Sequence, residues 1–387
     1  SFLAQNGTEF NFDLGTRVYN YGNLAQAGMT LTATVTNPSG VVVYNNSVSN
    51  ISLAAGDSLD VDPTQTNTLP QFSLASYPSG RYSLNYTLAL AGADDYAADN
   101  SITTVFSIQD SLYSYAQLDA TTNLPNAGNS YRPSANNQTY SVCNVINDAN
   151  ASRIGAEGIY FSATTSTASG AILTGEEMAL YLYKWEDVFV DLNDANLAFN
   201  TLTPVASGYY YYPADLQGEV VLGTFTTPVL LTDNQRYLAC VQTVNLNLYL
   251  GHESNTDYTW NYNFYAQPLT PNESDAAYFA AGFGPDVPSS IAVRVFDANN
   301  IGLTESKTID GVAYPNPATD KVTVSVNGEG VANLSVTDIS GKKVGTHVLN
   351  LINGSADVSI ENLEAGLYIF NVVLENGKTS QFNVVKR

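Results

Sequence analysis

Apolar and polar residues alternate along much of the chain, which is the period of a β-strand with one buried face. Two clear cases are Met29–Val35 and Tyr82–Leu90, in which every second residue is apolar. Turns such as Pro38-Ser39-Gly40 separate these runs, and no helical period appears. The pattern predicts an Ig-like β-sandwich over residues 1–109.

Residues 110–300 hold longer apolar runs that are rich in aromatic residues. The runs that predict strands are 159–163, 178–185, 219–225, 236–244, 258–265 and 291–296. Such a set of strands favours a larger, jelly-roll-like double sheet. A polar stretch with two glycines follows, so residues 301–311 are predicted to be a linker.

Residues 312–387 alternate again and predict a small antiparallel sandwich. Pro315 and Pro317 restrict the backbone, so the domain begins with a stiff, extended lead-in. The run Leu367–Leu374 is apolar on both faces, and we expect this strand in the centre of a sheet. The chain is therefore predicted to be all-β, with three tandem β-sandwich domains.

The last stretch also carries four motifs in order. They are Tyr314, Pro315, Asn316 and Pro317 at its start, Asp338, Gly341 and Lys342 in a central turn, Gly366 and Tyr368 in a strand, and Lys386 and Arg387 at its end. In these residues the stretch resembles the type A C-terminal sorting domain of type IX secretion cargo, which is found in Bacteroidota.

That resemblance implies passage through the periplasm and export across the outer membrane. It implies a translocon and a sortase-like peptidase as partners, with cleavage of the domain and attachment to surface lipopolysaccharide, or release. The N-terminal region resembles adhesion-related Ig-like modules of exported bacterial proteins through Asn20-Tyr21-Gly22, Leu53 with Gly56, Gly80 with Tyr82, and Asp99-Asn100. The expected location is the cell surface or the medium.

The net charge of −22 restricts the kinds of molecule that we expect this protein to bind. The first 300 residues hold 7 Lys or Arg against 27 Asp or Glu, so nucleic acid is an unsuitable partner. No apolar run reaches the length of a transmembrane helix. Residues 1–5 lack the basic start and apolar core of a signal peptide, so we expect a mature form or a fragment of a longer protein.

Two acidic loops are candidate Ca²⁺ sites, because Ca²⁺ takes oxygen ligands from short loops rich in Asp and Asn. One loop holds Asp94, Asp95 and Asp99, and the other holds Asp187, Asp191, Asn193 and Asp194. The alternative is that these side chains cap backbone groups in turns. No other cofactor is expected.

Cys143 and Cys240 both lie in predicted strands. In the oxidising periplasm a disulfide between them is reasonable, and two separate buried thiols are the alternative.

Aromatic side chains beside polar ones suggest sugar recognition in the middle region. The candidates are Trp185, Trp260, His252, and Tyr210 and Tyr212 from the Tyr209–Tyr212 run. The alternative is that such rings pack at sheet edges with wet hydroxyls. Asp57-Ser58-Leu59 and Asp110-Ser111-Leu112 resemble the O-glycosylation sites of this phylum, which makes Ser58 and Ser111 candidates.

Catalytic signatures are missing from the sequence. The only histidines are His252 and His347, and no zinc-protease, serine-hydrolase or phosphate-loop motif occurs. We therefore expect a protein without catalytic activity, an adhesion or glycan-binding protein exported by type IX secretion. The alternative is the C-terminal accessory region of a larger secreted hydrolase, with its catalytic domain before Ser1.

Overall fold

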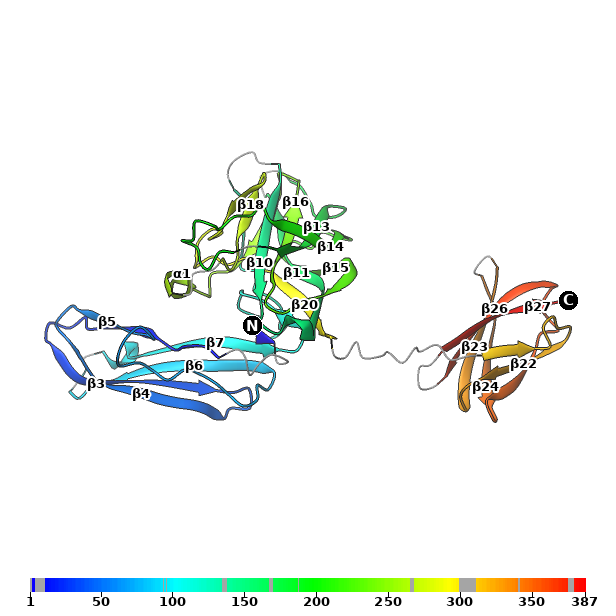
Figure 1. The fold of residues 1–387 in the computed structure, drawn as a ribbon, viewed down its shortest axis with the longest axis horizontal. Coiled ribbons are helices and arrows are strands. Elements are labelled where there is room, and N and C mark those ends of the chain that lie inside the picture. The colour runs from blue at the N-terminus through cyan, green and yellow to red at the C-terminus, as the bar shows by residue number, and fades with distance from the viewer. Residues whose placement is uncertain are drawn as a thin grey trace. The chain divides into compact units, whose positions relative to one another are not determined.

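The computed structural model describes residues 2–3, 11–92, 94, 96–133, 138–166, 170–186, 188–264, 268–298, 311–339, 342–374 and 379–387. It divides into two compact units, residues 1–299 and 300–387 (Figure 1). Each unit is built from β-sheets, so the all-β fold class is confirmed. The boundary predicted after residue 109 stays a prediction, and the predicted linker lies outside the described residues up to Gly311.

The N-terminal module, described over residues 2–3 and 11–109, has a core between a five-stranded sheet and a small sheet. The five-stranded sheet consists of β1 (Phe2–Leu3), β7 (Ser101–Gln109), β6 (Gly80–Ala89), β3 (Gln26–Thr36) and β4 (Val42–Leu53), in that order. The small sheet pairs β2 (Thr16–Tyr19) with β5 (Ser58–Val61). Alternation along β3 places Leu31, Ala33 and Val35 in the core, as the sequence predicts.

The middle module, residues 110–298, packs sheets face to face (Figure 1). Its six-stranded sheet, called the large sheet below, runs β14 (Leu202–Tyr211), β13 (Glu177–Trp185), β16 (Arg236–Thr243), β10 (Tyr140–Asn147), β18 (Asn272–Ser274) and β19 (Ala277–Phe279). The opposing sheet runs β15 (Val221–Leu230), β11 (Ile154–Phe161), β20 (Ala292–Asp297) and β8 (Leu112–Tyr113). A third sheet runs β12 (Ala163–Thr165), β17 (Leu248–His252) and β9 (Asn129–Tyr131). Val142, Leu180 and Val241 of the large sheet share a core with Phe161 and Val293.

One predicted strand of this module is wrong. The run 258–265 alternates like a strand, but its residues Thr259–Phe264 form the short helix α1. The carboxylate of Asp257 accepts a hydrogen bond of 2.7 Å from the backbone N–H of Thr259 at the start of this helix. Such a bond satisfies a donor that the first helical turn leaves without a partner. No helix among the described residues has the length and apolarity needed to cross a membrane.

The C-terminal unit is a sandwich of two antiparallel sheets. One sheet runs β21 (Gly311–Tyr314), β22 (Lys321–Val326) and β25 (Ser355–Ser359). The other runs β24 (Lys343–Leu351), β23 (Gly330–Asp338), β26 (Gly366–Leu374) and β27 (Thr379–Lys386). The predicted central strand is β26, and it lies between β23 and β27. Its Phe370 and Val372 are fully buried.

The proline-rich lead-in is bonded to the last strand by Asn316. The Asn316 side-chain N–H₂ donates to the carbonyl of Asn383 at 2.8 Å, and its carbonyl oxygen accepts from the backbone N–H of Val385 at 2.8 Å. Backbone bonds between Ala318 and both Val385 and Arg387, each 2.9 Å, continue the pairing. Hydrogen bonds therefore hold the start and the end of the sorting motif together.

The other motif residues shape the domain. The hydroxyl of Tyr368 donates to the carbonyl of Glu364 at 2.9 Å, while its ring is buried. The backbone N–H of Lys342 donates to the Asp338 carboxylate at 3.1 Å, which closes the predicted turn, whereas Gly341 lies outside the described residues.

Replacing Asn316 by Ala should loosen the last strand without unfolding the domain. Two hydrogen bonds are lost, at about 1 kcal/mol each, so the Val385 amide should exchange its proton at least about fivefold faster. Hydrogen exchange of the full chain measures this. Asn350→Ala, at an exposed position on β24, is the matched control, and equal exchange in Asn316→Ala and the control would contradict the role of Asn316.

Candidate functional site

The outer face of the large sheet, which points away from the shared core, carries a straight row of side chains. Strand registers place Ala179 opposite Gln242, Gln242 opposite Ser141, and Ser141 opposite Glu273. The row ends in a tyrosine on each side, Tyr209 on β14 and Tyr278 on β19. Because paired residues share a face, these six side chains lie on one surface.

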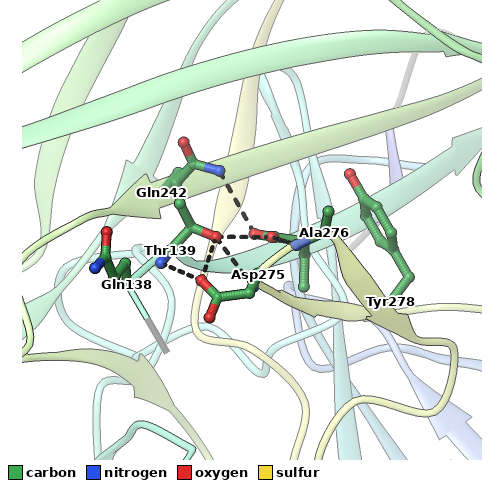
Figure 2. A pocket seen from close by; sticks show the side chains of 7 residues that line it. Gln138, Thr139, Gln242, Asp275, Ala276 and Tyr278 are labelled. Carbon is green, nitrogen blue, oxygen red and sulfur yellow. Dashed lines mark hydrogen bonds between the residues drawn. The ribbon is translucent and has the colours of Figure 1, made fainter. Parts of the chain in front are cut away.

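Part of this row forms a hollow of about 740 Å³. Its lining residues are Gln138, Thr139, Gln242, Glu273, Asp275, Ala276 and Tyr278, which Figure 2 draws as sticks. They come from the two residues just before β10, from β16 and from the β18–β19 hairpin, so strand pairing brings together residues more than 130 positions apart in the sequence. The hollow thus depends on the fold and on no local motif.

Glu273 is the central polar group of the hollow, although it is only 4% exposed. One carboxylate oxygen accepts from the Thr139 hydroxyl at 3.0 Å and from the Ala276 N–H at 2.6 Å. The other accepts from the Ser141 hydroxyl at 2.7 Å and lies 3.5 Å from the Gln242 amide. Neutral donors therefore surround this carboxylate and hold it in one position.

The hairpin between β18 and β19 has an unusual tight turn. Both central residues have positive φ, 48° for Asp275 and 63° for Ala276. Two-residue hairpins adopt this geometry, but they favour Gly at the second position, where Ala is strained. Thr139 holds the turn, since its backbone N–H donates to the Asp275 carboxylate at 2.8 Å (Figure 2).

Tyrosines border the row on the side of β13 and β14. Tyr181 and Tyr183 are stacked with ring centroids 5.6 Å apart, and Tyr209 beside them is 57% exposed. At the other end, burial and the charge of Glu273 raise the pKa of Tyr278 to about 12. The row therefore combines flat aromatic surfaces with hydrogen-bonding groups, and of these tyrosines Tyr278 lines the hollow itself.

The remaining part of the outer face is covered by the connection from β13 to β14, residues 186–201. The ring of Phe199 stacks on the rings of Tyr278 and Trp185, with ring centroids 4.3 Å and 4.5 Å apart. Phe189 of the same connection packs against Trp185. The Arg236 guanidinium lies 3.8 Å from the centroid of the Phe189 ring. These rings form a second small core outside the sheet.

Cys143 and Cys240 form a disulfide within this second core. They lie directly opposite each other on β10 and β16, two residues along from the pair Ser141 and Gln242 and on the same face of the sheet. The structure therefore has the predicted bond, and not the alternative of two separate thiols. The bond joins β10 to β16, the strand that contributes Gln242 to the hollow.

Several predicted ligand-binding rings are buried, which corrects the sequence prediction. Trp185 and Tyr212 are each 1% exposed, and Tyr210 is half-buried against the main core. A sugar cannot stack on a ring with no exposed face. The exposed members of the tyrosine run are Tyr209 and Tyr211. The sequence prediction therefore assigned the exposed face of this strand to the wrong two tyrosines.

His252 and Trp260 lie apart from the hollow. His252 is fully buried on β17, where its ring packs against Tyr131 and Phe283. Burial lowers the pKa of His252 to about 4, so it is neutral at ordinary pH and inaccessible to a sugar. Trp260 is half-buried on α1, and neither residue lines the hollow.

The carboxylates of Asp94, Asp191 and Asp194 accept hydrogen bonds from backbone N–H groups of their own loops. Asp94 accepts from the Tyr96 N–H, and Asp191 from the Asn193 N–H. Bonds from the Asn196 and Val190 amides lower the pKa of Asp194. No group of three potential metal-ligating side chains occurs among the described residues, while Asp95 and Asp187 lie outside them. Calcium binding, including through Asp99, stays a prediction.

Ser58 and Ser111 are exposed, and their glycosylation also stays a prediction.

Comparison with known proteins identifies the C-terminal unit. Residues 312–386 match the family described as secretion system C-terminal sorting domain. This confirms the predicted sorting signal. The protein is exported through type IX secretion to the cell surface or the medium, and its C-terminal domain engages that machinery.

The remaining comparisons are weak. No curated protein matches the chain. Among solved structures it is similar to the β-glucuronidase of Ruminococcus gnavus, at 10% identity and a TM-score of 0.16, with 64% of this chain and 34% of that one covered. The complex of that enzyme with D-glucuronic acid gives 10% identity, a TM-score of 0.15, and 64% and 36% coverage. The chain thus spans about a third of these structures, and so low a TM-score carries no argument.

Removing the disulfide should destabilise the middle module. It closes a loop with a sequence separation of 97 residues, so the double variant Cys143→Ala/Cys240→Ala should lose about 4 kcal/mol of unfolding free energy. Denaturant unfolding measures this loss. A reducing agent should reproduce it in the original protein and leave the double variant unchanged; a loss below about 1 kcal/mol would contradict the prediction.

Replacing Ala276 by Gly should stabilise the module by about 1 kcal/mol, because Gly adopts positive φ without a steric cost. Thermal unfolding of the full chain measures the gain. Ala277→Gly is the matched control, since Ala277 belongs to β19 and a glycine there should destabilise the protein by about 0.5–1 kcal/mol. Equal effects at the two positions would show that the turn is not strained.

Proposed function

We propose that the protein is a non-catalytic glycan-binding protein of the cell surface or medium, and that it binds sugar on the outer face of the large sheet. The observation that carries this proposal is the row from Tyr209 to Tyr278, in which the exposed ring of Tyr209 and the half-buried ring of Tyr278 border hydrogen-bonding side chains. Pyranose rings stack their apolar faces on tyrosine and use their hydroxyls for hydrogen bonds, so both kinds of group are needed together.

The dimensions of the row suit an oligosaccharide. Adjacent strands lie about 4.8 Å apart, so Tyr209 is roughly 10 Å from Gln242, with only the small side chain of Ala179 between them. A ligand of two or three sugar units would reach from Tyr209 to the hollow. Binding on a rigid sheet also limits the entropy that the protein loses.

A binding role fits the state of the carboxylate better than a catalytic one. The Glu273 carboxylate accepts bonds from Thr139, Ala276 and Ser141 and is 4% exposed. A general acid or nucleophile needs a reactive oxygen within reach of substrate. The sorting domain delivers this binding face to the outside of the cell, where adhesion would use it. Cleavage by a sortase-like peptidase and attachment to lipopolysaccharide belong to the same proposal.

The double variant Tyr181→Ala/Tyr209→Ala should lose glycan binding by about tenfold or more, since it removes two stacking surfaces. A glycan array with the full chain finds the ligand, and titration calorimetry measures the loss. Tyr21→Ala is the matched control, because Tyr21 is 80% exposed on the N-terminal module. Silence across the array, or an equal loss in the control, would contradict the proposed function.

A further inference from the structure

The hollow has a negative charge that the protein does not neutralise locally. Its lining includes Glu273 and Asp275 but no Lys, Arg or His. In the part of the chain that the structure describes, neither carboxylate forms an ion pair, and all hydrogen bonds to them come from neutral donors. Two carboxylates that share the Thr139 hydroxyl reinforce each other's negative potential.

One carboxylate oxygen of Asp275 forms no hydrogen bond with the described part of the chain. Asp275 binds Thr139 through a single oxygen, at 2.8 Å from the backbone N–H and 3.2 Å from the hydroxyl. Figure 2 shows the second oxygen of Asp275 pointing away from Thr139. The residue is exposed, so this oxygen can accept from a bound molecule. The strained turn fixes its direction, because both turn residues have left-handed backbone geometry.

Charged groups further from the hollow do not make its electrostatic potential positive. Residues 111–298 hold five Lys or Arg against 18 Asp or Glu. Arg132 is the cation whose field reaches Asp275, but its guanidinium lies over the Tyr140 ring at 5.5 Å and donates to the carbonyl of Leu248. Arg236 lies on the covered part of the outer face, against Phe189. The two carboxylates of the hollow and the acidic excess of the module therefore give the hollow a net negative potential.

We propose that the hollow selects a glycan with a protonated amino sugar over neutral and anionic sugars; this rests on the proposed function. The ammonium group donates to the free oxygen of Asp275. The sugar ring lies on the face of Tyr278 that Phe199 leaves uncovered, since Phe199 stacks on the other face at 4.3 Å. A uronic acid would place a third carboxylate beside Glu273 and Asp275, and such like-charge contact opposes binding.

Titration calorimetry of the full chain at 150 mM salt tests this with three trisaccharides: glucosamine, N-acetylglucosamine and galacturonate. The glucosamine trimer should bind at least about tenfold more tightly than the N-acetylated trimer, and the galacturonate trimer should not bind. Asp275→Asn should reduce this preference to less than about threefold, because it removes the charge while Asn tolerates the left-handed turn.

Asp57→Asn is the matched control, since it removes one charge from an exposed turn of the N-terminal module. It should keep the full preference. Equal binding of the amine and N-acetylated trimers would overturn the inference and leave the proposed function standing. An equal loss in Asp57→Asn, or equal affinity for trilysine, would reduce the preference to general attraction of cations and also overturn it. If no sugar binds, the proposed function fails and the inference fails with it.

Discussion

The register between β10 and β16 is the constraint on which the middle module depends. Cys143 lies opposite Cys240, and the disulfide between them fixes that pairing covalently. A one-residue slip of β10 against β16 would turn Ser141 inward and Val142 outward, which would bury a polar side chain of the row in the core. Because β13 and β18 pair with these two strands, the same register also positions Ala179 and Glu273. One covalent contact therefore orders the whole row.

The β13–β14 connection divides the outer face into two parts with different roles. Where it folds back, Phe189 and Phe199 bury Trp185 and the disulfide. Beyond this connection Ala179 is half-buried, and Ser141 is buried and hydrogen-bonded to Glu273 and Gln242. Tyr278 belongs to both parts, since one ring face packs on Phe199 and the ring also lines the hollow. The stability of the covered half thus supports the geometry of the open half.

Sequence patterns predict the features of this protein that depend on residues close together in the chain. Alternation is enough for the all-β class, and the sorting motif is recognisable because its parts are ordered along one short stretch. The tyrosine run failed as a guide because four consecutive tyrosines give no alternation from which to tell Tyr209 from Tyr210. The 258–265 run failed because a strand and a single helical turn cannot be separated by a few alternating residues.

The hollow could not be predicted from sequence for a different reason. Its residues come from strands far apart in the chain, and only pairing brings Thr139 to within 3.0 Å of Glu273. The segment from Asn272 to Ala277 resembles an ordinary polar turn, without the Gly that would mark a left-handed hairpin. Likewise, Asn316 gives no local sign that it bonds to a strand 67 residues later. Long-range pairing was the missing information in each case.

The two units differ in net charge. The first 300 residues have a strong excess of acidic groups, while residues 301–387 hold 7 Lys or Arg against 9 Asp or Glu. An acidic body is repelled by anionic surface polymers over about one Debye length, roughly 8 Å at physiological salt. For a protein attached to an anionic cell surface, as proposed above, the contact or covalent link is therefore expected at the nearly neutral C-terminal unit and not at the acidic body.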